Sequence, residues 1–112
     1  MRPLIRILTG TLFVGLLLGV GALSAALTDP SSVNIDNFTF APAEITVAPG
    51  TKVTWTNRDD IPHIVTDAAE PRGFKSPPLD TGNTFSYVFT KTGTYHYFCS
   101  LHPRMQGTVV VK

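Results

Sequence analysis

Three side chains that bind metals through sulfur or nitrogen stand close together near the end of the chain: Cys99, His102 and Met105. Two residues separate each from the next, so one tight loop can place all three around a single point. Thiolate and thioether sulfur favour Cu(I), while imidazole nitrogen also accepts Cu(II). Two histidines, one cysteine and a distant methionine form the ligand set of copper electron-transfer sites. The spacing therefore predicts a mononuclear copper site at this loop.

The fourth ligand must come from another part of the chain. His63 follows Pro62 at the start of an expected strand and is the candidate. His96 is nearer to Cys99 in sequence, but alternate residues of a strand face opposite sides, so His96 points to the surface if Cys99 points to a metal. We therefore expect one copper ion, Cu(I) or Cu(II), held by four side chains: His63, Cys99, His102 and Met105.

The first residues have the pattern of an exported protein. Residues 1–6 carry two arginines and no acid, residues 7–23 are apolar, and small residues follow. This order is typical of a secretory signal peptide, which we place at residues 1–26, with cleavage after Ser24 as an alternative. Residues 7–27 are also about long enough to span a bilayer, so an uncleaved membrane anchor stays open.

Residues 27–112 are then expected to form one periplasmic domain. Without Arg2 and Arg6, seven Lys and Arg face eight Asp and Glu, and this near-neutral balance gives no support to a nucleic-acid partner. Small exported domains usually gain stability from disulfides. Cys99 is the only cysteine. A lone thiol in an oxidising compartment is a liability unless something such as a metal occupies the sulfur.

The rest of the chain alternates short β-type segments with turns. Residues 68–82 hold three prolines and two glycines and indicate a surface crossing with little regular structure. No sustained helical period occurs outside the leader, so about seven to eight short strands predict an all-β antiparallel sandwich. The expected strands are residues 33–40, 44–47, 51–57, 63–66, 83–90, 94–99 and 107–112.

Several conspicuous residues have ordinary structural explanations. We expect Trp55 to pack in the core, together with aromatic residues of the strands (Phe85, Tyr87, Phe89 and Tyr95). Asp59 and Asp60 are expected to form a solvated turn rather than a partner-docking site.

The chain resembles the cupredoxins (type 1 blue-copper proteins), and among them amicyanin and its short-loop relatives. The resemblance rests on residues 53–58, on Pro62-His63, on residues 93–99, and on the motif Cys99-x-x-His102-Pro103-x-Met105-x-Gly107. It implies an eight-stranded Greek-key sandwich with copper at one end. It also implies a monomer that shuttles electrons between transient redox partners, with a dehydrogenase and a c-type cytochrome as partner classes.

One position departs from that family. Such proteins commonly have Asn directly after the first histidine ligand, and this chain has Ile64. The backbone N–H of Ile64 can still donate to the Cys99 sulfur, but the side-chain link to the Ser100 region is missing. Contacts around the ligands tune metal affinity and potential, so we expect copper binding to survive while the potential stays open.

A one-electron carrier is favoured over an enzyme. A multicopper oxidase or a nitrite reductase needs additional histidine ligands, often one beside the cysteine, but Phe98 and Ser100 flank Cys99. A dinuclear copper site is excluded as well, because it bridges two cysteines and this chain has one. Copper delivery or storage with the same ligands is the open alternative, although the chain has only Met1 and Met105 as methionines. An adhesion sandwich without metal is the least favoured reading.

The electron is expected to pass through the exposed edge of His102. Neighbouring apolar residues would form a small patch around this edge, as weak redox encounters use small interfaces. Scattered surface hydrophobic residues are the alternative. The expected patch consists of Leu101, Pro103, Ile61, Pro62 and Pro42.

Overall fold

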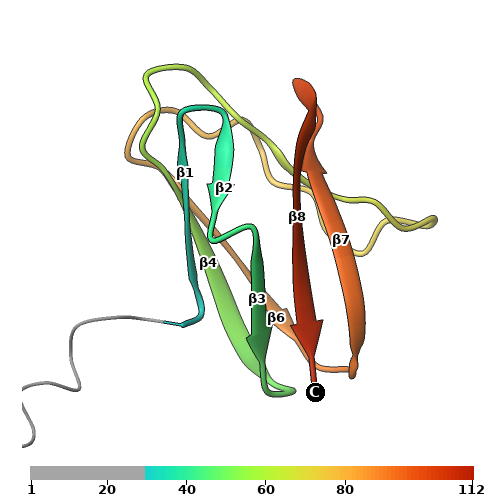
Figure 1. The fold of residues 1–112 in the computed structure, drawn as a ribbon. Coiled ribbons are helices and arrows are strands. Elements are labelled where there is room, and N and C mark those ends of the chain that lie inside the picture. The colour runs from blue at the N-terminus through green and yellow to red at the C-terminus, as the bar shows by residue number, and fades with distance from the viewer. Residues whose placement is uncertain (1–29) are drawn as a thin grey trace, which may run out of the picture.

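The computed structural model describes residues 30–112, and the expected signal peptide lies outside them. Eight strands form two stacked four-stranded sheets (Figure 1), with orders β2-β1-β4-β6 and β3-β8-β7-β5. In the described part, no helix is long and apolar enough to cross a membrane. The sequence prediction of an all-β sandwich is confirmed. The strands are β1 (Ser32–Asp36), β2 (Thr39–Ala41), β3 (Glu44–Val47), β4 (Thr51–Asn57), β5 (Val65–Asp67), β6 (Thr84–Phe89), β7 (Gly93–Cys99) and β8 (His102–Val111).

The segment predicted as one strand, residues 33–40, is two strands, so that prediction is wrong. The chain reverses at Asn37 and Phe38, whose φ angles are 53° and 58°, and β1 then pairs with β2 in antiparallel fashion. Two consecutive residues with positive φ are the signature of a type I′ hairpin turn. The second of these positions is usually Gly, and Phe38 concealed the turn in the sequence.

The strands nearest the predicted metal ligands also differ from prediction. The strand expected at residues 63–66 begins at Val65, and His63 makes only an isolated bridge with Leu79. The last strand begins at His102 rather than at residue 107, because β7 and β8 form a hairpin whose register shifts between Phe98 and Cys99. The segment that joins Cys99 to His102 is therefore the tip of a hairpin.

The antiparallel prediction holds for only part of the sandwich. The chain crosses from one sheet to the other after β2, and two pairs are parallel as a result: β1 with β4 and β3 with β8. The remaining pairs are antiparallel. Both sheets are therefore mixed.

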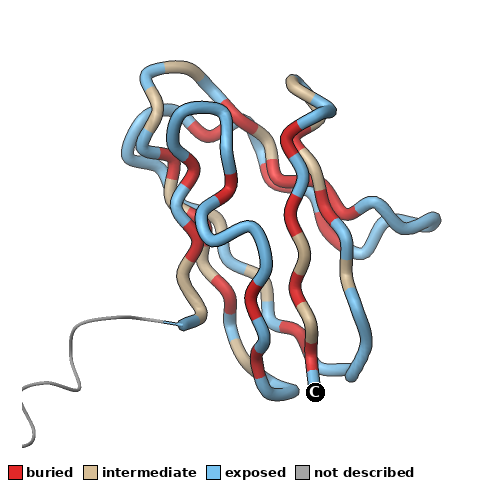
Figure 2. Tube along the Cα trace, viewed as in Figure 1, coloured by how far each residue is buried: buried red, intermediate tan, exposed pale blue. Residues whose placement is uncertain are grey.

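Buried and more exposed positions alternate along most strands (Figure 2), whereas all three residues of β5 are buried. Such alternation is expected where one face of each sheet packs against the other sheet. Trp55 lies fully buried at the centre, and its indole meets four aromatic rings: Phe74, Phe85, Phe89 and Tyr97. The predicted core role of Trp55 is confirmed. In β6, Phe85, Tyr87 and Phe89 turn the same face inward, as the alternation predicted.

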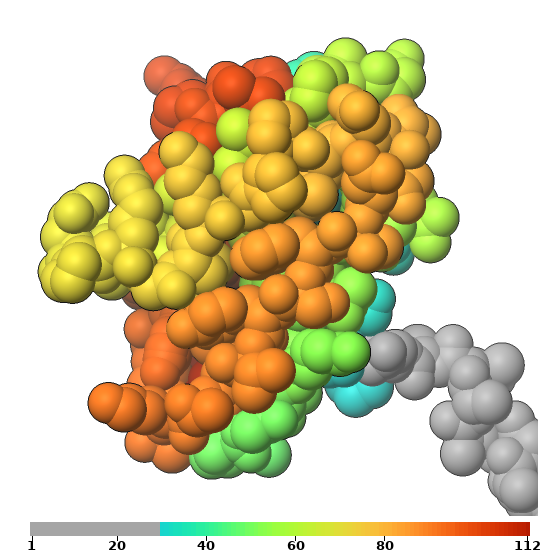
Figure 3. Space-filling view, turned by 180° about the vertical axis from the view of Figure 1, so that it is seen from behind, coloured from blue at the N-terminus to red at the C-terminus, as the bar shows by residue number. Residues whose placement is uncertain are grey.

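The surface crossing over residues 68–82 has little regular structure, as predicted. Its first part projects from the sandwich, as the yellow segment of Figure 3 shows from behind. The Asp67 carboxylate accepts hydrogen bonds from the N–H groups of Ala69 and Gly73 at the base of this projection. The Arg72 guanidinium lies over the Phe98 ring, 5.6 Å from its centre. These contacts fix the projection against the sheet.

Tyr97 fills the core opposite Gly107, its partner across β7 and β8. A Cβ atom at residue 107 would lie 2.3 Å from the Tyr97 ring, so only glycine permits this packing. The Tyr97 hydroxyl is buried without a hydrogen-bond partner. Burial raises the pKa of Tyr97 from 10.0 to about 12, and this effect is larger than the opposing effect of the nearby Trp55 indole.

This buried phenol should make the fold sensitive to alkali. Between pH 10 and 12 the unfolded chain ionises Tyr97 and the folded chain does not, so the free energy of unfolding falls as pH rises. The additional slope should approach about 1.4 kcal/mol per pH unit. Urea unfolding of the wild type and of Tyr97→Phe from pH 9 to 11.5 measures it. Parallel stability curves for the two proteins would contradict the prediction.

Candidate metal centre

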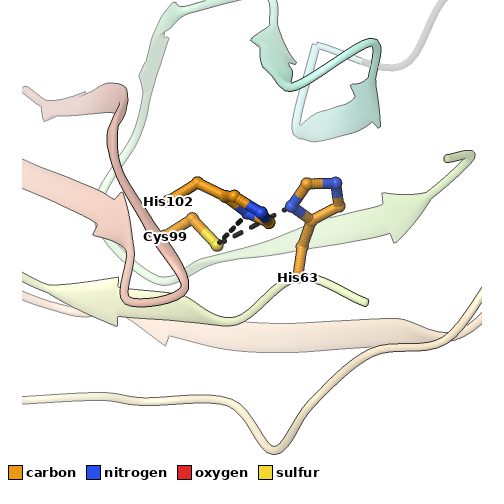
Figure 4. Close-up of side chains that lie close together, drawn as sticks. All are labelled: His63, Cys99 and His102. Atoms are coloured by element: carbon orange, nitrogen blue, oxygen red, sulfur yellow. Dashed lines mark hydrogen bonds between the residues drawn. The ribbon is translucent and has the colours of Figure 1, made fainter. Parts of the chain in front are cut away.

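Three connections meet at one end of the sandwich, at the top of Figure 1: the β1–β2 turn, the β4–β5 connection and the β7–β8 hairpin. There the side chains of His63, Cys99 and His102 point toward one another (Figure 4). The Cys99 Sγ atom lies 3.7 Å from Nδ1 of His63 and 3.7 Å from Nδ1 of His102. All three donor atoms lie within 4.8 Å of one another. His63 and Cys99 are fully buried, and His102 is half-buried.

These spacings fit one metal ion shared by three donors. Sulfur and nitrogen ligands of a first-row divalent ion lie at about 2.3 Å and 2.0 Å from it. At bond angles between tetrahedral and trigonal, two such donors are about 3.5–3.8 Å apart. The observed 3.7 Å falls in this interval on both sides of the sulfur. The residues present are therefore suited to a copper ion, for which the soft thiolate and the two imidazoles are appropriate ligands.

Met105 lies on β8, three residues after His102, and its side chain is buried in the same core cluster as Cys99. The three donor atoms that lie within 4.8 Å of one another belong to the other predicted ligands, His63, Cys99 and His102. His96 is exposed, and its Nδ1 atom lies 3.2 Å from the Thr108 hydroxyl. The prediction that His96 is a surface residue is confirmed.

The Cys99 sulfur also has a backbone partner. The N–H of Ile64 donates to Sγ over 3.4 Å, as the sequence led us to expect. A hydrogen bond to sulfur withdraws electron density from a thiolate and is one means of tuning a metal site. Because Ile64 has an apolar side chain, its contribution at this place is limited to the backbone.

The irregular segment between β4 and His63 is shaped by the buried side chain of Asn57. Its Nδ2 group donates to the carbonyl oxygens of Ile61 (2.9 Å) and Leu79 (2.7 Å). Its Oδ1 atom accepts the N–H of Asp59 over 2.9 Å. Leu79 in turn exchanges two backbone hydrogen bonds with His63. Asn57 thus replaces the strand hydrogen bonds that this segment lacks and fixes the backbone that carries His63.

Asp59 is not the solvated turn residue that the sequence predicted. Its side chain is only 11% exposed, and its Oδ2 atom lies 2.8 Å from Nε2 of His63. Burial opposes ionisation of Asp59, but hydrogen bonds from the N–H groups of Phe38 and Asn37, and from His63, outweigh it. The pKa of Asp59 is therefore lowered, and the side chain is a carboxylate at neutral pH. Asp60 is exposed, as predicted.

Phe38 is a neighbour of the site that sequence reasoning missed. Its ring meets His63 edge-on at 5.7 Å between centres and His102 at 5.1 Å. Edge-to-face pairs of this kind are attractive beyond their buried area. Phe38 is 51% exposed and contacts both imidazoles, so it lies between them and the solvent on one side. Sequence reasoning missed Phe38 because the hairpin turn that carries it lacks the usual Gly and was predicted as strand.

Comparison with known proteins points to one class. Residues 28–112 match the family described as copper binding proteins, plastocyanin/azurin family. Amicyanin-alpha from Methylorubrum extorquens is 37% identical over an alignment of 101 residues that covers 85% of each chain. The solved structure of a reduced amicyanin mutant gives a TM-score of 0.69 at 36% identity and covers 80% of this chain and 89% of that one. A purple cupredoxin from Nitrosopumilus maritimus gives 0.68 at 35% identity and covers 72% and 98%.

The support that Asn57 gives to the His63 segment can be tested by Asn57→Asp. The carboxylate cannot donate to Ile61 or Leu79 and would face two carbonyl oxygens in a buried place. We expect the metal-free protein to lose about 2–4 kcal/mol in the free energy of unfolding, measured with urea. The matched control is Asn83→Asp, because the hydrogen bond recorded for the Asn83 side chain is one that its Oδ1 atom accepts, from the Asp80 N–H. An equal loss in both variants would refute the assignment.

Proposed function

Because the chain belongs to the copper-binding plastocyanin/azurin family, the cupredoxins, and its relatives include amicyanins, we propose that it is a periplasmic one-electron carrier. The proposed ligands of its copper ion are His63, Cys99, His102 and Met105. The observation that supports this most directly is the position of the Cys99 sulfur, 3.7 Å from one nitrogen of each histidine. The bound copper supplies the reversible change between Cu(II) and Cu(I).

The protein contributes a fixed set of donors. Cys99 stands at the end of β7, which pairs with both β5 and β8, so its position is held from two sides. His63 is fixed by its bridge to Leu79 and by Asp59. Donors that move little between two oxidation states keep the cost of electron transfer low, and complete burial of Cys99 keeps water from the sulfur.

The proposed path for the electron leads through His102. It is the half-buried member of the cluster, and Leu101 beside it is 49% exposed. In the predicted apolar patch, Pro103, Pro62 and Pro42 are also exposed, whereas Ile61 is half-buried. Phe38 adds a further exposed ring next to His102. We propose that transient redox proteins, such as a dehydrogenase and a c-type cytochrome, dock on this end of the molecule.

Export is the remaining part of the proposal. It is supported by the leader pattern of residues 1–26 and by a family match that begins only at residue 28. Residues 27–112 would then be the mature copper domain, with no substrate of its own.

Addition of Cu(II) to the mature domain tests the function. We expect one equivalent to produce an intense visible thiolate-to-copper band, reversible one-electron voltammetry with retention of the metal, and loss of the band in Cys99→Ser. Met105→Ala should keep the band with altered intensity and potential, because the thioether is a weak ligand. A colourless protein that binds Cu(I) alone and passes it to a chelator would instead indicate copper delivery.

The docking end can be tested by electron self-exchange, which needs no identified partner. In Leu101→Glu, two like charges meet when two copies approach through this end, and we expect the exchange rate to fall about tenfold, equivalent to about 1.4 kcal/mol. Val88→Glu is the matched control, because Val88 is 46% exposed and lies on β6. Nuclear magnetic resonance line broadening in mixtures of the two oxidation states measures the rate. An equal slowing in both variants would contradict the proposed path.

A further inference from the structure

The Asp59 carboxylate connects two parts of the molecule that meet at the donor cluster. Its Oδ2 atom lies 2.8 Å from Nε2 of His63. Its two oxygens also accept the N–H groups of Asn37 (2.6 Å) and Phe38 (3.0 Å) from the β1–β2 turn. Among residues 30–112, the one ion-pair partner recorded for Asp59 is His63. A nearly buried carboxylate is thus directed at a proposed metal ligand and not at a surface cation.

The hydrogen bond to His63 decides which ring nitrogen carries the proton. A carboxylate only accepts hydrogen bonds, so Nε2 of His63 must be the donor. The neutral ring then presents the free electron pair of Nδ1, and this is the atom that lies 3.7 Å from the Cys99 sulfur. A carboxylate on the outer nitrogen also orients the ring and makes it a more basic ligand. His63 is fully buried, so water does not compete for this bond.

The other two hydrogen bonds hold an unfavourable turn. Asn37 and Phe38 both have positive φ angles, a conformation that residues with side chains seldom adopt. The carboxylate accepts both successive N–H groups and so stabilises the reversal. This β1–β2 turn places the Phe38 ring against the imidazoles of His63 and His102.

We propose that Asp59 is a positioning residue of the copper site, which keeps the His63 proton on Nε2 and seats Phe38 against His63 and His102. The inference rests on the proposed role of His63 as a ligand and extends it to a residue outside the ligand set. An anionic partner on the outer nitrogen favours the higher metal charge. Loss of this anion should therefore weaken Cu(II) binding more than Cu(I) binding.

The first test uses the metal-free protein and needs no copper. Nitrogen-15 resonance of the histidine rings should show the Nε2–H tautomer of His63 in the wild type. Asp59→Asn should shift His63 toward the Nδ1–H tautomer, because the amide offers one acceptor oxygen to three donors. Asp60→Asn makes the same change of charge at the exposed neighbour and should leave the tautomer unchanged. An Nδ1–H tautomer in the wild type, or no difference between the variants, would overturn the proposal.

The second test measures the two copper affinities. Asp59→Asn should lower Cu(II) affinity about 10–100-fold, with Asp60→Asn close to the wild type. The loss for Cu(II) should exceed that for Cu(I) by about tenfold, which raises the reduction potential by about 59 mV. An equal loss for both ions would show that Asp59 only supports the fold, and would overturn the positioning role. A wild type that binds no copper through Cys99 would refute the proposed function, while the tautomer measurement would still decide the role of Asp59.

A second background separates the two contacts of Asp59 and protects the test against misfolding. Phe38→Gly creates an Asn-Gly turn, which favours the type I′ geometry without help from a carboxylate. Within this background, adding Asp59→Asn should still shift the His63 tautomer and the ratio of Cu(II) to Cu(I) affinity. If both shifts vanish, Asp59 acts through the turn alone and its direct role toward His63 is refuted.

Discussion

The molecule depends on bringing one sulfur and two nitrogen atoms, which come from distant parts of the chain, to one end of a β-sandwich. Strands supply this placement only in part. Cys99 is the last residue of a hydrogen-bonded strand, and His102 is the first residue of the next, so the hairpin register fixes both. His63 has no such strand around it. The position of His63 is therefore the critical requirement, and the polar side chains of this end of the molecule are arranged to meet it.

Asn57 and Asp59 hold His63 in position, and to do so their polar side chains are largely removed from water. Moving polar groups away from water is unfavourable unless their hydrogen bonds are replaced. All the hydrogen bonds recorded for these two side chains go to backbone groups of nearby loops or to His63. Replacement of the water contacts by directed bonds gives an irregular segment the rigidity of a strand. In a low-dielectric interior such a network is also strong, since each charged or dipolar contact is less screened than in water.

The sequence predicted the elements whose signal is local. The limits of β4 agree with the alternation of Val53 and Trp55, and the face of β7 that holds Cys99 was assigned correctly against His96. The proximity of Cys99 and His102 could be anticipated because they lie three residues apart, and this spacing does not depend on where the strands end. The parallel pairs could not be read from alternation, because they depend on the chain crossing between sheets.

The role of Asp59 could not be predicted for a related reason. Its neighbours Asn37 and Phe38 lie more than twenty residues away in sequence, and their turn lacks the Gly that would have revealed it. A pair of aspartates after Asn57 and Arg58 has the composition of an ordinary exposed turn, and Asp60 is indeed an exposed residue. Only the folded positions of the β1–β2 turn and His63 distinguish Asp59 from its neighbour. Composition therefore predicts the exposure of Asp60 correctly and that of Asp59 wrongly.

The place of β8 in its sheet has a consequence for the order of folding. β8 is the final strand, yet it lies between β3 and β7 and pairs with both. Until β8 has emerged, β3 has no partner in that sheet and the hairpin that joins Cys99 to His102 does not exist. Contacts so distant in sequence make folding slow relative to helical proteins. The closing of this sheet and the formation of the hairpin that joins Cys99 to His102 thus require the same strand, β8.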